Sequence, residues 1–117
     1  PGFYDTLATL PSGDVRMVQC FVRPARVKEF LRLTREPPLL GAAACVPMAE
    51  VLRSGILGPG QPHPALKNRL GDYTLFAAPG HAFLYPAALS DEKAPKFGNH
   101  GGLSADELEV PLFVVTP

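Results

Sequence analysis

Glycine and proline are the residues that most constrain what this chain can fold into. The sequence holds 11 glycines and 14 prolines among 117 residues, about one residue in five. Both residue types are depleted in the interiors of helices and strands, so much of the chain has to connect short elements. A chain of this length forms at most one domain and buries roughly two-thirds of its unfolded surface. Residues 1–117 are interpreted as a single domain or a fragment, and the first residue, a proline rather than a methionine, favours the fragment.

The first part of the sequence indicates a lead-in segment, a strand and a helix. Residues 1–14 form the lead-in segment, which ends in the turn signal Pro-Ser-Gly-Asp. Residues 15–22 alternate in the pattern of a strand. One face of this strand carries the side chains of Arg16, Val18, Cys20 and Val22. Pro24 then opens an amphipathic helix of about 10–12 residues, which ends before Pro37 and Pro38.

A second strand and a second helix follow. Residues 39–46 form a short apolar run with small side chains, which predicts an interior strand. Residues 48–54 are expected to form a short helix that Gly55 closes in a left-handed conformation. Alternation of strand and helix predicts an α/β class, with α+β also possible. The expected architecture is a small mixed sheet with two or three short helices.

The third part of the chain carries a turn signal and a long connection. Residues 72–77 and 82–85 flank an Ala-Pro-Gly-His segment, and this pattern predicts a β-hairpin. Residues 86–103 form a long loop that carries His100. Compact domains rarely keep a loop of this length without a functional reason.

The last part of the chain predicts a short helix and a final strand. Ser104 and Glu107 have the spacing of a capping box, so a helical turn begins there. Residues 110–115 are continuously apolar, which is typical of a strand buried on both faces. If this strand is separated from its sheet, it leaves an exposed edge, and we expect the chain to self-associate.

Charge and composition exclude several classes of protein. Eleven basic residues balance eleven acidic ones, so the chain lacks the positive charge of a nucleic-acid binding surface. No apolar run approaches the roughly 18–20 residues of a membrane span. The basic residues near the first helix are interpreted as a solvated face: Arg16, Arg23, Arg26, Lys28, Arg32 and Arg35.

The two cysteines, Cys20 and Cys45, lie among apolar neighbours in the predicted strands. They are interpreted as buried free thiols in a reducing compartment, which leans the localisation toward the cytoplasm. A disulfide between them would require neighbouring strands with suitable geometry.

Three histidines and one aspartate are the candidate site residues. His63 lies between two prolines and His81 in the predicted hairpin turn, and both are interpreted as exposed loop residues. His100 differs, because glycines on both sides and a buried strand behind it would hold it as a metal ligand or as an acid or base. Asp72 is interpreted as a turn or cap carboxylate, or alternatively as a hydrogen-bond partner of a metal-bound histidine. The spacing of these residues does not match a zinc motif, and nucleotide-binding glycine motifs and a nucleophilic serine motif are absent.

The residues around His100 resemble a known family. The stretch 99–112, Asn-His-Gly-Gly-Leu-Ser-Ala-Asp-Glu-Leu-Glu-Val-Pro-Leu, resembles the C-terminal motif of the alkaline phosphatase superfamily. The branch it looks most like is the type I phosphodiesterase/nucleotide pyrophosphatase group with its PglZ-like relatives. Residues 58–60, 62–64 and 69–73 resemble segments shortly upstream of that motif, so the likeness spans about residues 15–117.

This resemblance implies the C-terminal part of an alkaline-phosphatase-like fold and a two-metal hydrolase. It implies two divalent metals, usually zinc, that act on a phosphate-ester or nucleotide substrate. His100 is the one metal ligand that the motif carries over, and no catalytic residue is assigned. The nucleophile and the Asp-x-His-Gly ligand segment of the family are missing, so the N-terminal remainder of a parent chain has to supply them. By itself the chain is expected to bind no metal and to be inactive. The alternative is a standalone small α/β module that binds a ligand or partner without catalysis.

Overall fold

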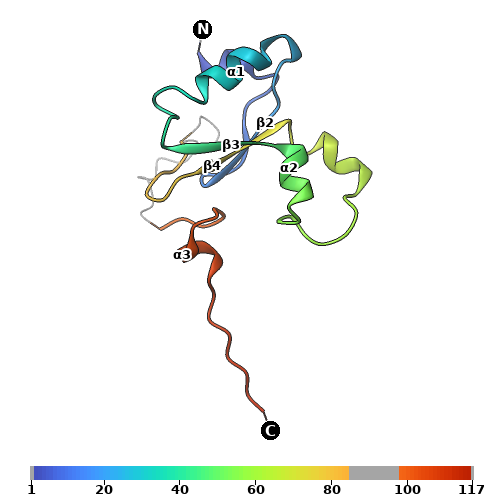
Figure 1. Ribbon diagram of the computed structural model, residues 1–117, viewed down its shortest axis with the longest axis vertical. Coiled ribbons are helices and arrows are strands. Elements are labelled where there is room, and N and C mark those ends of the chain that lie inside the picture. The colour runs from blue at the N-terminus through green and yellow to red at the C-terminus, as the bar shows by residue number, and fades with distance from the viewer. Residues whose placement is uncertain (1, 85–97, 117) are drawn as a thin grey trace.

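The computed structural model describes residues 2–84 and 98–116. Its centre is a four-stranded antiparallel sheet in the order β1-β2-β4-β3, and short helices lie around it (Figure 1). The strands are β1 (Ser12–Asp14), β2 (Met17–Cys20), β3 (Ala43–Pro47) and β4 (Tyr73–Ala77). The helices are α1 (Val27–Leu33), α2 (Met48–Arg53) and α3 (Ala105–Leu108), with 3-10 turns η1 (Phe3–Thr6), η2 (Pro24–Arg26) and η3 (Pro64–Asn68). The predicted small α/β fold with short helices is confirmed.

One face of the sheet packs against α1. Phe30 of α1 is fully buried and contacts Tyr73 of β4, with ring centroids 5.1 Å apart. The buried side chains of this cluster are Leu7, Val18, Cys20, Val22, Phe30 and Leu75. Because Val18 and Cys20 alternate along β2, both reach the same face, as the period of the strand requires.

The opposite face packs against α2. Met48 and Val51 of this helix are buried with Phe76 of β4. The predicted end of the helix is confirmed, because Gly55 follows the last turn with a φ of 72°. Burial on both faces explains why the central strand β4 is apolar over most of its length.

Two of the predictions about how the strands pair with one another are wrong. The segment 39–46 was expected to be an interior strand, but β3 pairs only with β4 among the described strands and lies at the edge of the sheet. The expected hairpin does not form between β4 and residues 82–84, because β4 already pairs with β2 on one side and with β3 on the other. Phe83 instead donates its backbone N–H to the carbonyl of Val15 at 2.7 Å. Residue 85 and most of the predicted long loop lie outside the described residues.

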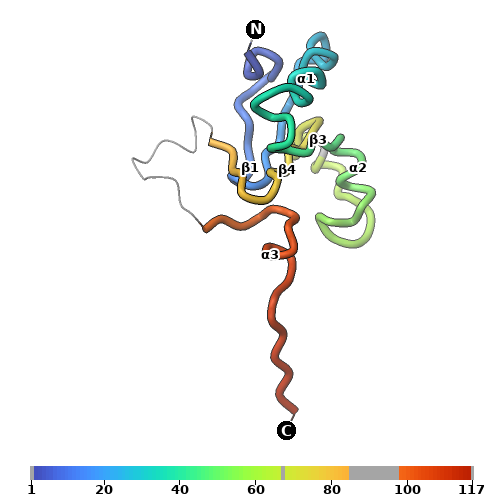
Figure 2. The backbone as a smooth tube through the Cα atoms, turned by 60° about the vertical axis from the view of Figure 1, so that its left-hand side comes forward, coloured from blue at the N-terminus to red at the C-terminus, as the bar shows by residue number. Residues whose placement is uncertain are grey.

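The final segment is also placed differently from the prediction. Residues 110–115 are extended, but they pair with none of the described strands and are exposed rather than buried on both faces. Figures 1 and 2 show this segment running away from the sheet beyond α3. The physical reason is that neither edge of the four-stranded sheet lies along its path, so the apolar side chains find no cover within the described part of the chain.

Candidate functional site

The loop that carries His100 lies against the turn between β1 and β2. Gly101 adopts a φ of 92°, which side chains other than glycine rarely tolerate, and it lies next to the side chain of Asp14. The N–H of Gly102 donates to Glu107 Oε1 at 2.9 Å. A Cβ atom at position 102 would lie 2.4 Å from the Glu107 carboxylate, so a side chain there would force the carboxylate out of its present position. The two glycines after His100 thus have a structural role: Gly101 adopts a left-handed backbone conformation, and Gly102 leaves room for the carboxylate of Glu107.

The predicted capping box is confirmed and fixes the end of this loop. Ser104 precedes α3 and donates its hydroxyl to Glu107 Oε2 at 2.6 Å, and its N–H donates to the same oxygen at 3.3 Å. The carboxylate of Glu107 therefore binds the loop at Gly102 and at Ser104. This local arrangement follows from spacing alone, since residues three apart meet at a helix start.

Arg16 attaches this loop to the sheet. Its side chain is 7% exposed, and that of Glu107 is 9% exposed. The guanidinium donates from Nε to Oε1 and from Nη2 to Oε2 of Glu107, both at 2.8 Å. Its Nη1 donates to the carbonyls of Ala78 and His81. One side chain thus connects the β1–β2 turn, the segment after β4 and the start of α3, and the two-point contact with the carboxylate sets their relative orientation.

The ion pair stays charged over a wide pH range. The hydrogen bonds from Arg16, and then the one from the Ser104 hydroxyl, hold the pKa of Glu107 well below its ordinary value. The hydrogen bond to Glu107 raises the pKa of Arg16. Each group stabilises the charged form of the other, as expected for a close pair of opposite charges.

The interpretation of Arg16 as part of a solvated basic face is therefore wrong. The alternation of residues 15–22 placed Arg16 on the same face as Val18, Cys20 and Val22, which are all buried. A buried guanidinium requires an anion. This signal was present in the sequence, but the partner was not, because 91 positions separate Arg16 from Glu107. The interpretation fits α1, where Arg32 pairs with Glu36 on an exposed surface.

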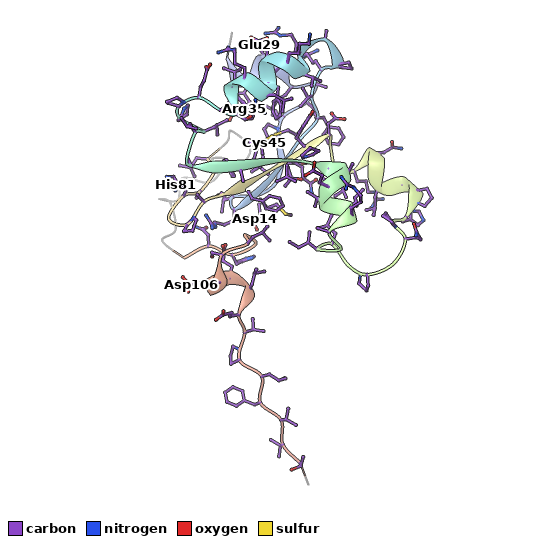
Figure 3. All side chains as sticks on the ribbon, viewed as in Figure 1. Asp14, Glu29, Arg35, Cys45, His81 and Asp106 are labelled. Carbon is purple, nitrogen blue, oxygen red and sulfur yellow. The ribbon has the colours of Figure 1, made fainter. Side chains whose placement is uncertain are left out.

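The three histidines differ in what their rings contact. His63 Nδ1 accepts the N–H of Ala65 at 3.1 Å and so caps η3. His81 Nδ1 lies 3.1 Å from the carbonyl oxygen of Pro79, and its ring is exposed (Figure 3). The ring of His100 is exposed and makes no hydrogen bond with any residue that the structure describes. His100 therefore combines a loop that is fixed on its C-terminal side with ring nitrogens that none of the described residues contacts.

The described residues do not form a metal centre on their own. Among residues 2–84 and 98–116, no three His, Cys, Asp or Glu side chains lie together in a group that could hold a metal. Zinc requires three or four protein ligands, so His100 would have to be joined by donors from elsewhere. The side chain of Asp72 accepts the N–H of Val22, 50 positions earlier, at 2.7 Å, so it joins two distant segments and does not play the local turn or cap role predicted for it. We therefore derive no catalytic step from these residues.

Comparisons with other proteins do not assign the chain to a family. No family model matches it, and neither a curated protein nor a solved structure matches it. Within the described residues, none of the helices has the length and apolar character needed to cross a membrane. The function is therefore inferred from the arrangement of His100, Glu107 and Arg16.

Proposed function

We propose that this chain is the C-terminal part of a metal-dependent hydrolase of the phosphodiesterase or nucleotide pyrophosphatase type, and that it supplies one metal ligand, His100. One observation carries the proposal: the loop of His100 is fixed to the sheet through Glu107 and Arg16, while the His100 ring is exposed and free of described hydrogen bonds. A metal ligand needs a free nitrogen lone pair and a backbone that holds it in position.

The proposal divides the work between this chain and the N-terminal remainder. The remainder would supply the nucleophile, the other ligands of the two divalent metals and the contacts to a phosphate-ester or nucleotide substrate. Bound metals of this kind polarise the phosphoryl oxygen and stabilise the leaving group. The role of the described residues is to hold His100 in position, and they are given no other chemical role.

The test begins with the coding sequence upstream of Pro1. The proposal expects several hundred codons that contain an Asp-x-His-Gly segment and a serine or threonine nucleophile. In the longer protein, His100→Ala should lower the metal content and reduce the hydrolysis of bis-p-nitrophenyl phosphate by at least about a hundredfold. His63→Ala and His81→Ala serve as matched controls, because their rings contact neighbouring backbone. Normal metal content and turnover in the His100→Ala protein would remove His100 from the site.

A second candidate is a small binding module without catalysis. It is favoured by an apolar hollow of about 700 Å³ beside β3, lined among others by Ala44, Val46 and Phe76. Binding pockets in proteins are commonly of this size and are mostly apolar. This candidate predicts a start codon within a few residues of Pro1, and ligand or partner binding that the His100→Ala substitution leaves unchanged.

A further inference from the structure

The segment 110–115, which we call the apolar tail, has no cover in the described chain. Its exposed fractions run from 76% at Val114 to 91% at Val115, and Phe113 is 88% exposed. Every side chain in the tail is apolar, so both faces of an extended strand would be apolar. Such a strand is stable only as part of a sheet whose two faces are both covered by other side chains.

The edge strand β3 offers unpaired backbone groups. Ala78 donates its N–H to the carbonyl of Ala42, and Met48 donates to the carbonyl of Asp72. In an antiparallel pair the bonding direction alternates along the strand, so the even-numbered residues of β3 face β4. The N–H and carbonyl of Cys45 then face outward, and no strand of the described residues pairs with them. This edge can accept one more strand at Cys45, although the N–H of Ala43 already donates to the carbonyl of Leu39 and Pro47 has no N–H.

A hollow lies beside this edge on each face of the sheet. On the α2 side lies the hollow of about 700 Å³, which reaches Ala44, Val46 and Phe76. On the α1 side, a second hollow of about 250 Å³ is lined by Leu31, Thr34 and Cys45. The side chains of an added strand alternate between the two faces and would enter both hollows. The edge therefore fits a strand that is apolar on both faces, which is the pattern of the tail.

We propose that the apolar tail of one copy of this chain adds as a fifth strand to the β3 edge of a second copy. The lengths agree, since β3 has five residues and the tail has six. Few charges lie at the contact: the sequence from 37 to 49 and from 110 to 117 contains no charged side chain, while Glu50 borders the larger hollow and Arg35 the smaller one. This contact does not depend on the proposed metal-ligand role of His100.

A second copy suits the tail better than β3 of its own chain. The ion pair of Glu107 with Arg16 fixes α3, and the tail leaves α3 in a direction away from the sheet (Figure 2). A return to its own β3 would need a turn that uses about four residues and leaves too few to cover the edge. Two exchanged tails would bury on the order of 1,200 Å² or more, the size at which stable specific interfaces begin.

The test measures association of the full 117-residue chain by sedimentation velocity from low micromolar to near-millimolar concentration. One variant, Leu112→Asp combined with Val114→Asp, places charges in the tail. A second variant, Ala44→Glu, places a charge at the larger hollow, and Ala44 is exposed, so the fold tolerates it. Leu10→Asp is the matched control, because Leu10 is 55% exposed and lies in neither the tail nor β3.

We expect the wild-type chain and the Leu10→Asp control to associate with rising concentration. Both test variants should associate at least about tenfold more weakly, because a charge in an apolar contact is costly. A mixture of the two test variants should still form a complex, since one contributes an intact tail and the other an intact edge. Circular dichroism verifies that each variant is folded. A wild-type chain that stays monomeric, variants that associate normally, or a mixture that forms no complex would each overturn the proposal.

Discussion

The ion pair of Arg16 and Glu107 is the contact on which the position of the His100 loop depends. Arg16→Met removes the guanidinium and keeps most of the apolar length of the side chain. The substitution breaks four hydrogen bonds, two to the Glu107 carboxylate and one each to the carbonyls of Ala78 and His81. It also leaves the carboxylate in a place where its side chain is only 9% exposed, without an opposite charge.

The size of the effect follows from what Arg16 leaves behind. Removing one partner of a fully buried ion pair costs roughly 3–5 kcal/mol. Here the carboxylate keeps its hydrogen bonds from Gly102 and Ser104, so we expect about 2–3 kcal/mol for Arg16→Met. This corresponds to a roughly 30- to 150-fold larger population in which residues 98–109 are released from the sheet.

Hydrogen exchange at the amide of Gly102 measures this release, because Gly102 is buried in the folded chain and becomes accessible to water when the segment leaves the sheet. We expect exchange to accelerate by the same factor in Arg16→Met, while the amides of β4 stay protected. Arg26→Met is the matched control, since its ion pair with Glu29 is partly exposed and such pairs contribute little. Unchanged exchange at Gly102 in Arg16→Met, or an equal acceleration in the control, would refute the reasoning.

Four further predictions concern the same structure. Gly102→Ala should release the loop as Arg16→Met does, because its Cβ would lie 2.4 Å from the Glu107 carboxylate, whereas Gly98→Ala meets open space and should leave the Gly102 exchange rate unchanged. The pKa of Glu107 in the folded chain lies below its ordinary value of 4.5. The ion pair therefore stabilises the fold fully above pH 4.5, and this stabilisation is lost as the pH falls through the folded pKa. The free energy of unfolding should accordingly fall more steeply with acid in the wild type than in the double variant Arg16→Met with Glu107→Met. Phe30→Ala should lower the free energy of unfolding by roughly 3–5 kcal/mol in urea titrations, because Phe30 is fully buried, while Tyr4→Ala at a 47% exposed position should cost much less. Burial raises the pKa of the Cys20 thiol to about 12, so iodoacetamide at pH 8 should modify the half-buried Cys45 first and Cys20 only on unfolding; equal rates at both thiols would contradict this burial.

The helices were predictable because their signals are local. Pro24 and the apolar spacing after it predicted the helical segment that the structure divides into η2 and α1. Gly55 marked the end of α2, and Ser104 with Glu107 marked the start of α3. In each case the residues that interact lie within four positions of one another, so the spacing in the sequence already determines the contact.

The neighbours of the strands were less predictable, because strand pairing joins distant segments. Small apolar side chains suggested that residues 39–46 lie inside the sheet, but β3 lies at its edge. The two strand-like runs around the Ala-Pro-Gly-His turn suggested a hairpin, yet both sides of β4 are taken by β2 and β3. The apolar pattern of residues 110–115 predicted a buried strand, but this segment pairs with none of the described strands, because the pattern carries no information about which sheet edge, if any, lies within reach.

For the candidate site, the sequence by itself determined the local parts: the glycines that turn the chain after His100, the capping box, and an arginine in phase with a buried face. Only the tertiary structure decided that Arg16 meets Glu107 across 91 positions and that this pair fixes the His100 loop to the sheet. The physical reason is that a buried charge requires a partner, whereas the identity of that partner depends on how the whole chain packs.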